Sequence, residues 1–158
     1  FQHALKWLAE HEDYVPDVIV QLRPTSPFRP PKFVDKAVGI LLKDKTADCV
    51  RAVVPSGQNP YKMWCLTKHG YMSPLLKIPK VTEPYNMLRQ QLPATYWQTG
   101  HVDVARYKTI MTKGSMSGDR ILPAILDRRY AVDIDTESDW ASAEWMIDKL
   151  GLSIVKPL

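Results

Sequence analysis

The stretch that most constrains the fold is VIVQLRPTSPFR, residues 18–29, where an apolar run stops at a loop bracketed by prolines. The run is mostly β-branched and almost continuously apolar, which is typical of a central strand covered on both faces of a sheet. Pro24 and Pro27 fix the backbone around Thr25 and Ser26, so two hydroxyls are held at the carboxyl end of this strand. Because ligands of open α/β sheets bind at that end, this loop is the first candidate binding site.

The size and composition fit one globular domain. The chain has 158 residues, 45% of them hydrophobic and 24% charged, which is enough to bury a core without staples. Its net charge of +4 arises from scattered Lys and Arg, which suits an anionic substrate but indicates no nucleic-acid or membrane partner. No apolar run reaches the roughly 18 residues of a membrane span, and no signal peptide is visible. We therefore expect a cytoplasmic protein.

The cysteines and histidines show no spacing typical of a transition-metal site. Cys49 and Cys65 each stand alone in an apparent strand, so we expect buried, reduced thiols. His3 and His11 are expected at the solvent edge of the first helix.

Hydrophobic periodicity predicts alternating helices and strands, and therefore an α/β fold. One helix between the first two strands implies that these strands run parallel, joined by a right-handed crossover. The expected elements are a helix over residues 1–12, a strand over 18–22, a helix over 30–41, a strand over 49–54, a hairpin over 63–76, a short helix over 86–90, a strand over 96–104, a short helix over 108–111, a strand over 130–135 and a final helix after residue 136.

The final helix has clear boundary signals. Thr136 and Asp139 have the spacing of a capping box, and Gly151 supplies the C-cap. Its expected buried stripe consists of Trp140, Ala143, Ile147 and Leu150.

Two carboxylates, Asp133 and Asp135, stand two residues apart in the last predicted strand and would share one face. Such a pair can hold Mg²⁺ together with water and substrate phosphate oxygens. Alternatively, Asp135 only favours the positive end of the following helix, and Asp133 is a solvated strand residue. The residues alone leave both interpretations open.

Neither a catalytic nucleophile nor a glycine-rich phosphate loop is visible in the sequence. Ser26 lies in no G-x-S-x-G elbow, and the seven glycines form no G-x-G-x-x-G or Walker pattern. Arginine is the better clamp for carboxylates and phosphates, and we single out Arg29 and Arg89. The basic residues near predicted loops are Arg23, Arg29, Lys62, Arg89, Lys113 and Arg120.

Four motifs carry a resemblance to a known family. They are LRPTSPFR (22–29), NPYK (59–62), RQQLP (89–93) and VDIDTESDW (132–140). In this order and at about this spacing they resemble the acylneuraminate cytidylyltransferases, or CMP-sialic acid synthetases, over nearly the whole chain. RQQLP and DIDTE at this separation are specific, whereas PTSP alone is only suggestive. The related CMP-Kdo synthetases usually differ at the first loop and rank lower.

The resemblance implies a Rossmann-like, three-layer nucleotidyltransferase fold with a mostly parallel sheet, forming a single domain over residues 1–158. It also implies a homodimer in which residues 61–78 project as a dimerisation segment. The implied reaction transfers CMP from CTP to the anomeric hydroxyl of a nine-carbon 2-keto sugar acid and releases pyrophosphate, with Mg²⁺ required.

The resemblance also assigns the candidate site residues. Asp133 and Asp135 look like the Mg²⁺ ligands and are the candidate catalytic residues. Arg89, with Gln90 beside it, is similar to the arginine that holds the sugar, and Lys62 to a lysine donated across the dimer. The remaining expected substrate-binding residues are Arg23, Thr25, Ser26, Arg29 and Asp103. The general base is left open between Asp133, Asp135 and a metal-bound hydroxide.

Two departures from the family pattern bear on the sugar. Arg23 stands where the family commonly has Gln, and Asp103 ends a TGHVD stretch where the sialic acid enzymes have NGAIY. Both lie in the region expected to contact the sugar, which leaves legionaminic, pseudaminic and other nonulosonic acids open. A nucleotidyltransferase for a different sugar or nucleotide, or a non-catalytic dimeric sugar-nucleotide-binding domain, is the alternative.

The start of the chain differs from the family as well. Family members begin with a strand and a basic loop similar to ARxGSKGxxxKN, which binds the triphosphate and would lie before Phe1. We therefore expect these residues to correspond to the carboxyl-terminal two-thirds of the enzyme and to be inactive alone.

Overall fold

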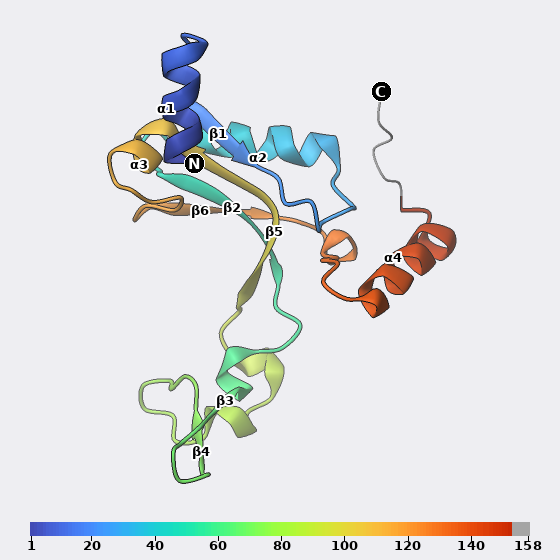
Figure 1. Ribbon diagram of the computed structural model, residues 1–158. Coiled ribbons are helices and arrows are strands. Elements are labelled where there is room, and N and C mark those ends of the chain that lie inside the picture. The colour runs from blue at the N-terminus through green and yellow to red at the C-terminus, as the bar shows by residue number, and fades with distance from the viewer. Residues whose placement is uncertain (153–158) are drawn as a thin grey trace. The chain divides into compact units, whose positions relative to one another are not determined.

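The computed structural model describes residues 1–152, which form two compact units (Figure 1). Unit 1 contains Phe1–Val54 and resumes at Gln98, and unit 2 contains Pro55–Trp97. No helix within residues 1–152 has both the length and the apolar character needed to cross a membrane. The elements are α1 (Gln2–His11), β1 (Val18–Gln21), α2 (Pro31–Lys43), β2 (Cys49–Pro55), η1 (Pro60–Lys62), β3 (Trp64–Leu66), β4 (Met72–Pro74), η2 (Pro84–Asn86), η3 (Arg89–Gln91), β5 (Tyr96–Arg106), α3 (Tyr107–Met111), β6 (Ile121–Ile125), η4 (Arg128–Tyr130) and α4 (Glu137–Leu150).

A four-stranded mixed sheet with the order β1-β5-β2-β6 forms the centre of unit 1. β1 runs antiparallel to β5, and β6 runs parallel to β2. β5 also runs antiparallel to β2, as two hydrogen bonds between their residues show. The Arg106 amide bonds to the Asp48 carbonyl, whereas the Thr99 hydroxyl bonds to the Ala52 carbonyl. β1, β2 and β6 therefore share one direction, and β5 opposes them.

The prediction of a mostly parallel sheet is wrong, because β5 is antiparallel to both of its neighbours. The predicted parallel direction of β1 and β2 is correct, but β5 lies between them (Figure 1). The chain path explains this difference. The chain leaves the sheet after β2, passes through the hairpin and the 3-10 helices of unit 2, and has no crossover helix there, so it returns beside β2 in the opposite direction.

β1 lies at the edge of the sheet, so the prediction of a central strand covered on both faces is wrong for the strands that the structure describes. Val20 and Leu22 are exposed. A β-branched run fits any strand that packs on a partly buried surface, and composition alone does not distinguish an edge from a centre.

Helices pack on both faces of the sheet, as an α/β fold requires. α2 lays its apolar stripe on β2, β5 and β6, where Val50 and Val104 are among the buried residues. Leu5 of α1 and Ile110 of α3 lie in a second cluster with Cys49 of β2. Since consecutive strand residues point to opposite faces, Cys49 and Val50 mark the two sides of the sheet.

The predicted strand over residues 130–135 is wrong, and β6 was not expected. Residues 131–135 form an irregular segment after η4. The sequence YAVDID has the composition of a strand, but β6 already pairs with β2 at that edge of the sheet. The segment therefore connects β6 to α4 without joining the ladder.

The predicted ends of α4 are confirmed, but most of its predicted stripe is not buried. Thr136 and Asp139 form a capping box, and Gly151 has a left-handed φ of 61°. Ala143 is buried beside Phe28, whereas the other three stripe residues are exposed. They are Trp140, Ile147 and Leu150.

Unit 2 contains the predicted hairpin, in which β3 and β4 pair antiparallel with Trp64 opposite Pro74. η2 and η3 occupy the region where a short helix was expected. Cys65 is exposed in β3, so the expectation of a buried thiol is wrong there, while Cys49 in β2 is buried and free as predicted.

Candidate functional site

The proline-bracketed loop after β1 is fixed by Arg29. Its Nε donates to the His101 carbonyl at 2.8 Å, and its Nη2 donates to the Arg23 carbonyl at 2.5 Å. Burial lowers the pKa of Arg29. Arg29 was predicted to bind substrate, and the structure shows it bracing the loop against β5 through two backbone carbonyls. Phe28 anchors the same loop and is fully buried.

The two hydroxyl residues of the loop lie in different surroundings. The Thr25 carbonyl accepts a hydrogen bond from the Ile134 amide at 2.9 Å, which ties the loop to the segment before α4. Ser26 is buried, and its Oγ has no hydrogen-bond partner among the described residues. Because a buried hydroxyl without a partner is costly, Ser26 Oγ is a candidate contact for a ligand or water.

His101 was not among the predicted site residues, yet it lies at the centre of this region. It is fully buried in β5, and neither ring nitrogen makes a hydrogen bond of good geometry within residues 1–152, although backbone groups of Tyr130 and Thr99 lie near the ring. Burial lowers the pKa of the imidazole, and a neutral ring offers one donor and one acceptor nitrogen. The sequence signal was the polar alternation of His101 and Asp103 inside an apolar strand, which places both on one face.

Asp103 forms a buried ion pair with Arg51 across β5 and β2. Arg51 Nη1 lies 2.5 Å from Asp103 Oδ2, and the two side chains are 15% and 2% exposed. Burial raises the pKa of Asp103, while Arg51 and Arg23 favour its charged form. Arg51 Nη2 donates to Ser117 Oγ at 2.5 Å. The second carboxylate oxygen, Oδ1, is buried and has no partner in the part of the chain that the structure describes.

The Arg23 side chain lies over Gly100 of β5. A Cβ built on Gly100 would lie 2.7 Å from Arg23 Cδ, and the φ of Gly100 is +75°, so glycine is required there. Arg23 also acts electrostatically on Asp103. Arg23 and Asp103, two of the predicted substrate-binding residues, are therefore close enough to interact electrostatically.

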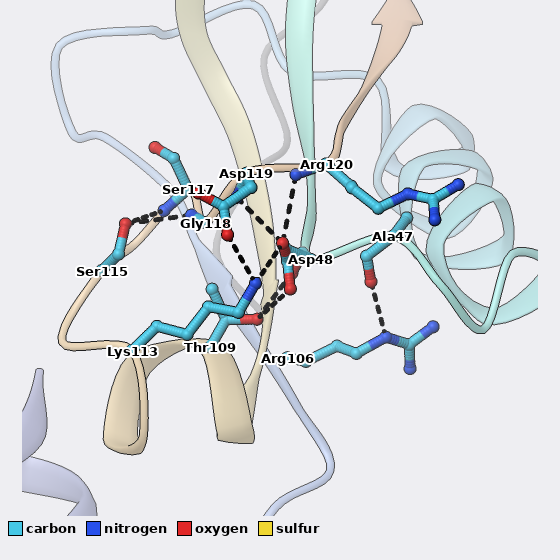
Figure 2. Close-up of polar contacts among 10 residues, drawn as sticks. All are labelled: Ala47, Asp48, Arg106, Thr109, Lys113, Ser115, Ser117, Gly118, Asp119 and Arg120. Atoms are coloured by element: carbon cyan, nitrogen blue, oxygen red, sulfur yellow. Dashed lines mark hydrogen bonds and ion pairs between the residues drawn. The ribbon is translucent and has the colours of Figure 1, made fainter.

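The loop between α3 and β6 is held by Asp48, which directly precedes β2 (Figure 2). Hydrogen bonds, first that from Lys113, hold the pKa of Asp48 far below its ordinary value. Oδ2 of Asp48 accepts from Lys113 Nζ at 2.8 Å and from the amides of Asp119 and Arg120 at 2.9 and 3.1 Å. These contacts fix the loop from which Ser117 reaches Arg51.

Asp133 and Asp135 lie in the irregular segment before α4. Asp133 Oδ1 is buried without a partner among the described residues, whereas Asp135 is exposed and donates its amide to Asp139 Oδ2 at 3.2 Å. Within residues 1–152, no group of three or more His, Cys, Asp or Glu side chains is arranged to hold a metal ion. Because these residues are not in a strand, their two-residue spacing does not place them on one face. Mg²⁺ is usually bound by one or two carboxylates plus water and phosphate oxygens, so each of the two remains a candidate ligand.

The remaining predicted residues lie in unit 2. Arg89 Nη2 donates to the Ser56 carbonyl at 2.9 Å, and Arg89 and Gln90 line a pocket of about 430 Å³ with Asn59. Lys62 Nζ donates to the Tyr85 carbonyl at 2.9 Å. The structure thus brings Arg89 and Gln90 together in unit 2, and Arg23, Thr25, Ser26, Arg29 and Asp103 together around the end of β1 in unit 1.

No protein-family model matches the chain. Over 133 residues the chain is 29% identical to the CMP-N,N'-diacetyllegionaminic acid synthase of Legionella pneumophila. The match covers 84% of this chain and 54% of the synthase, so the chain spans about half the length of this curated relative. The similarity supports the resemblance to CMP-nonulosonic acid synthases at a low level of identity.

Proposed function

We propose that this chain is part of a cytidylyltransferase that activates a nonulosonic acid in the cytoplasm. The anomeric oxygen of a nine-carbon 2-keto sugar acid bonds to the α-phosphorus of CTP, the bond to the β-phosphate breaks, and pyrophosphate leaves. The observation that carries this proposal is the 29% identity to the Legionella synthase over 133 residues. The order of the PTSP, RQQLP and DIDTE motifs supports it.

The buried polar atoms behind the PTSP loop support a polar ligand in unit 1. Each such atom costs free energy unless a ligand or water supplies a hydrogen bond, and a polyhydroxylated sugar acid offers both donors and acceptors. The atoms without partners within residues 1–152 are Ser26 Oγ, both ring nitrogens of His101, Asp103 Oδ1 and Asp133 Oδ1. Thr25, Ser26 and Arg23 then bind substrate, and Arg29 holds the loop.

Asp133 and Asp135 are the residues that would hold Mg²⁺. The unpartnered Oδ1 of Asp133 and the exposed carboxylate of Asp135 support this role. When bound, Mg²⁺ offsets the negative charge of the phosphates. Each carboxylate is also a candidate acceptor for the anomeric proton.

In unit 2 we assign Arg89 and Gln90 to sugar binding and Lys62 to a site shared between two copies in a homodimer. The pocket that Arg89 and Gln90 line supports the first assignment. Exposed apolar side chains on the β3–β4 hairpin support the second, because they gain free energy on burial against a partner. Among them are Leu66, Tyr71 and Met72.

Pyrophosphate release tests the proposal. The assay uses CTP, Mg²⁺ and a panel of nonulosonic acids, with the full gene product that carries this sequence and with the 158-residue chain alone. We expect turnover by the full product with at least one sugar and none by the chain alone. No turnover with any sugar or nucleotide would favour a non-catalytic binding domain.

The two departures from the family pattern, Arg23 and Asp103, favour a second candidate, in which the same chemistry acts on a different sugar. Asp103 stands where the NGAIY stretch of the sialic acid enzymes ends in Tyr. A tyrosine hydroxyl both donates and accepts hydrogen bonds, whereas a carboxylate only accepts them, so the group that Asp103 contacts on the sugar must be a donor. Preference for a diacetamido sugar over N-acetylneuraminic acid in the panel would identify this specificity.

A further inference from the structure

We propose that Arg51 is a positioning residue that presents one oxygen of Asp103 to the sugar acid as a hydrogen-bond acceptor. This inference rests on the function proposed above and adds a residue that none of the motifs contains. It follows from three observations on one face of the sheet: the ion pair of Arg51, the free oxygen of Asp103 and the loop that holds Arg51.

The ion pair divides the two oxygens of Asp103 between two tasks. Oδ2 accepts a hydrogen bond from Arg51 Nη1 at 2.5 Å, whereas Oδ1 is buried without a partner among the residues that the structure describes. Arg51 thereby fixes the rotation of the carboxylate and leaves Oδ1 as an acceptor with a defined direction. Arg51 favours the charged form of Asp103, and a hydrogen bond to a charged carboxylate is stronger than one between neutral groups.

Arg51 is itself held at both ends of its guanidinium fork. Nη1 binds Asp103, and Nη2 donates to Ser117 Oγ at 2.5 Å. Ser117 belongs to the loop that Asp48 fixes through Lys113 and two backbone amides (Figure 2). The planar fork of arginine fits two fixed acceptors, which a lysine ammonium cannot match with the same geometry.

Arg23 also has a role in this proposal, since it acts electrostatically on Asp103. The Arg23 side chain is exposed, lies over Gly100 and makes no hydrogen bond within residues 1–152, so no hydrogen bond has to break when it shifts. When Arg23 moves aside to meet an anionic group of the substrate, Oδ1 becomes available to a neighbouring donor. The substrate class is thus a sugar acid that carries a hydroxyl or an acylamino N–H close to its negative charge.

The experiment measures the Kd of the full gene product for N,N'-diacetyllegionaminic acid, N-acetylneuraminic acid and CTP by calorimetry. The variants are Asp103→Asn, Arg51→Lys and Ser117→Ala, and Arg106→Lys is the control. In Asp103→Asn, Arg51 holds the amide oxygen, so the NH₂ group faces the sugar donor. We expect sugar binding to weaken roughly tenfold or more in Asp103→Asn, and several-fold in Arg51→Lys and Ser117→Ala, at unchanged Kd for CTP.

The control separates positioning from stability. Within residues 1–152 the Arg106 guanidinium bonds only to the backbone carbonyls of Ala47, Leu41 and Asp44, so Arg106→Lys should lower Tm and leave the sugar Kd unchanged. Unchanged sugar binding in both Arg51→Lys and Ser117→Ala would overturn the positioning role proposed for Arg51. Equal loss of sugar and CTP binding together with Tm would show a purely structural role. If the wild type binds neither sugar, the proposed substrate class fails, and this role of Asp103 fails with it.

Discussion

Gly118 packs directly on the side chain of Asp48. A Cβ built on Gly118 would lie 2.5 Å from Cβ and Cγ of Asp48, and the φ of Gly118 is +64°. Two requirements therefore coincide at one position, a left-handed backbone and a close approach that only a hydrogen atom allows. The glycine lets the loop of residues 113–120 close over the carboxylate so that the next two amides reach Oδ2.

Gly118→Ala should therefore destabilise the protein by roughly 2–3 kcal/mol, because backbone strain and steric overlap add. Thermal unfolding of the purified chain measures the change. Gly39→Ala is the matched control, since Gly39 lies in the interior of α2 with no atom within 4 Å of the added Cβ. That control should stabilise the helix by about 0.5–1 kcal/mol. Equal Tm changes in the two variants would contradict the packing argument.

The stability of the fold should fall at acid pH through Asp48. Its hydrogen bonds hold its pKa in the folded state well below the ordinary 3.8. A depressed pKa contributes stability above about pH 4 that is lost as the pH falls further. Asp48→Asn should lower the free energy of unfolding at pH 7 and flatten its decline between about pH 4 and pH 2. Urea unfolding at a series of pH values measures both effects.

Asp148→Asn, at an exposed position on α4, is the control for this series. Its free energy of unfolding should decline below pH 4 as steeply as that of the wild type. An Asp48→Asn protein whose stability declined as steeply as the wild type below pH 4 would show that other groups govern the acid transition.

Local signals predicted local structure well. The capping box of Thr136 with Asp139 and the left-handed Gly151 set the ends of α4 as expected, because their energies depend on neighbours in sequence. The arrangement of strands was less predictable. Whether residues 18–22 form a central or an edge strand, and whether residues 130–135 join the sheet, depends on which edges distant segments occupy.

The same distinction applies to the candidate site. Motifs identified Arg23 and Asp103 separately, but their proximity depends on the pairing of β1 with β5, which sets Gln21, two residues before Arg23, opposite Asp103. Arg51 and His101 were missed, because each is a polar residue in an apolar strand. The partners of Arg51, which are Asp103 and Ser117, also lie far away in sequence. A charged residue at an alternate position of CVRAVV was the available signal for Arg51.

Mg²⁺ should stabilise the full gene product in the presence of CTP, and Asp135→Ala should abolish this response. At a metal concentration of 100 Kd, the expected stabilisation is about 2.7 kcal/mol. Thermal unfolding with and without Mg²⁺ measures it. Asp127→Ala is the control, since its carboxylate pairs with Arg129 on the surface. If Asp135→Ala responds as the wild type does, Asp135 is not a metal ligand.

The β3–β4 hairpin should mediate self-association. Leu66 and Tyr71 are 80% and 74% exposed, and such a pair on a short hairpin favours burial against a second copy. Light scattering should give a mass of two chains for the wild type and one chain for the variant Leu66→Ser with Tyr71→Ser. Trp145→Ser, at an exposed apolar position on α4, should leave the mass at two chains. A monomeric wild type would remove the basis for Lys62 acting across subunits, and a dimeric double variant would place the interface elsewhere.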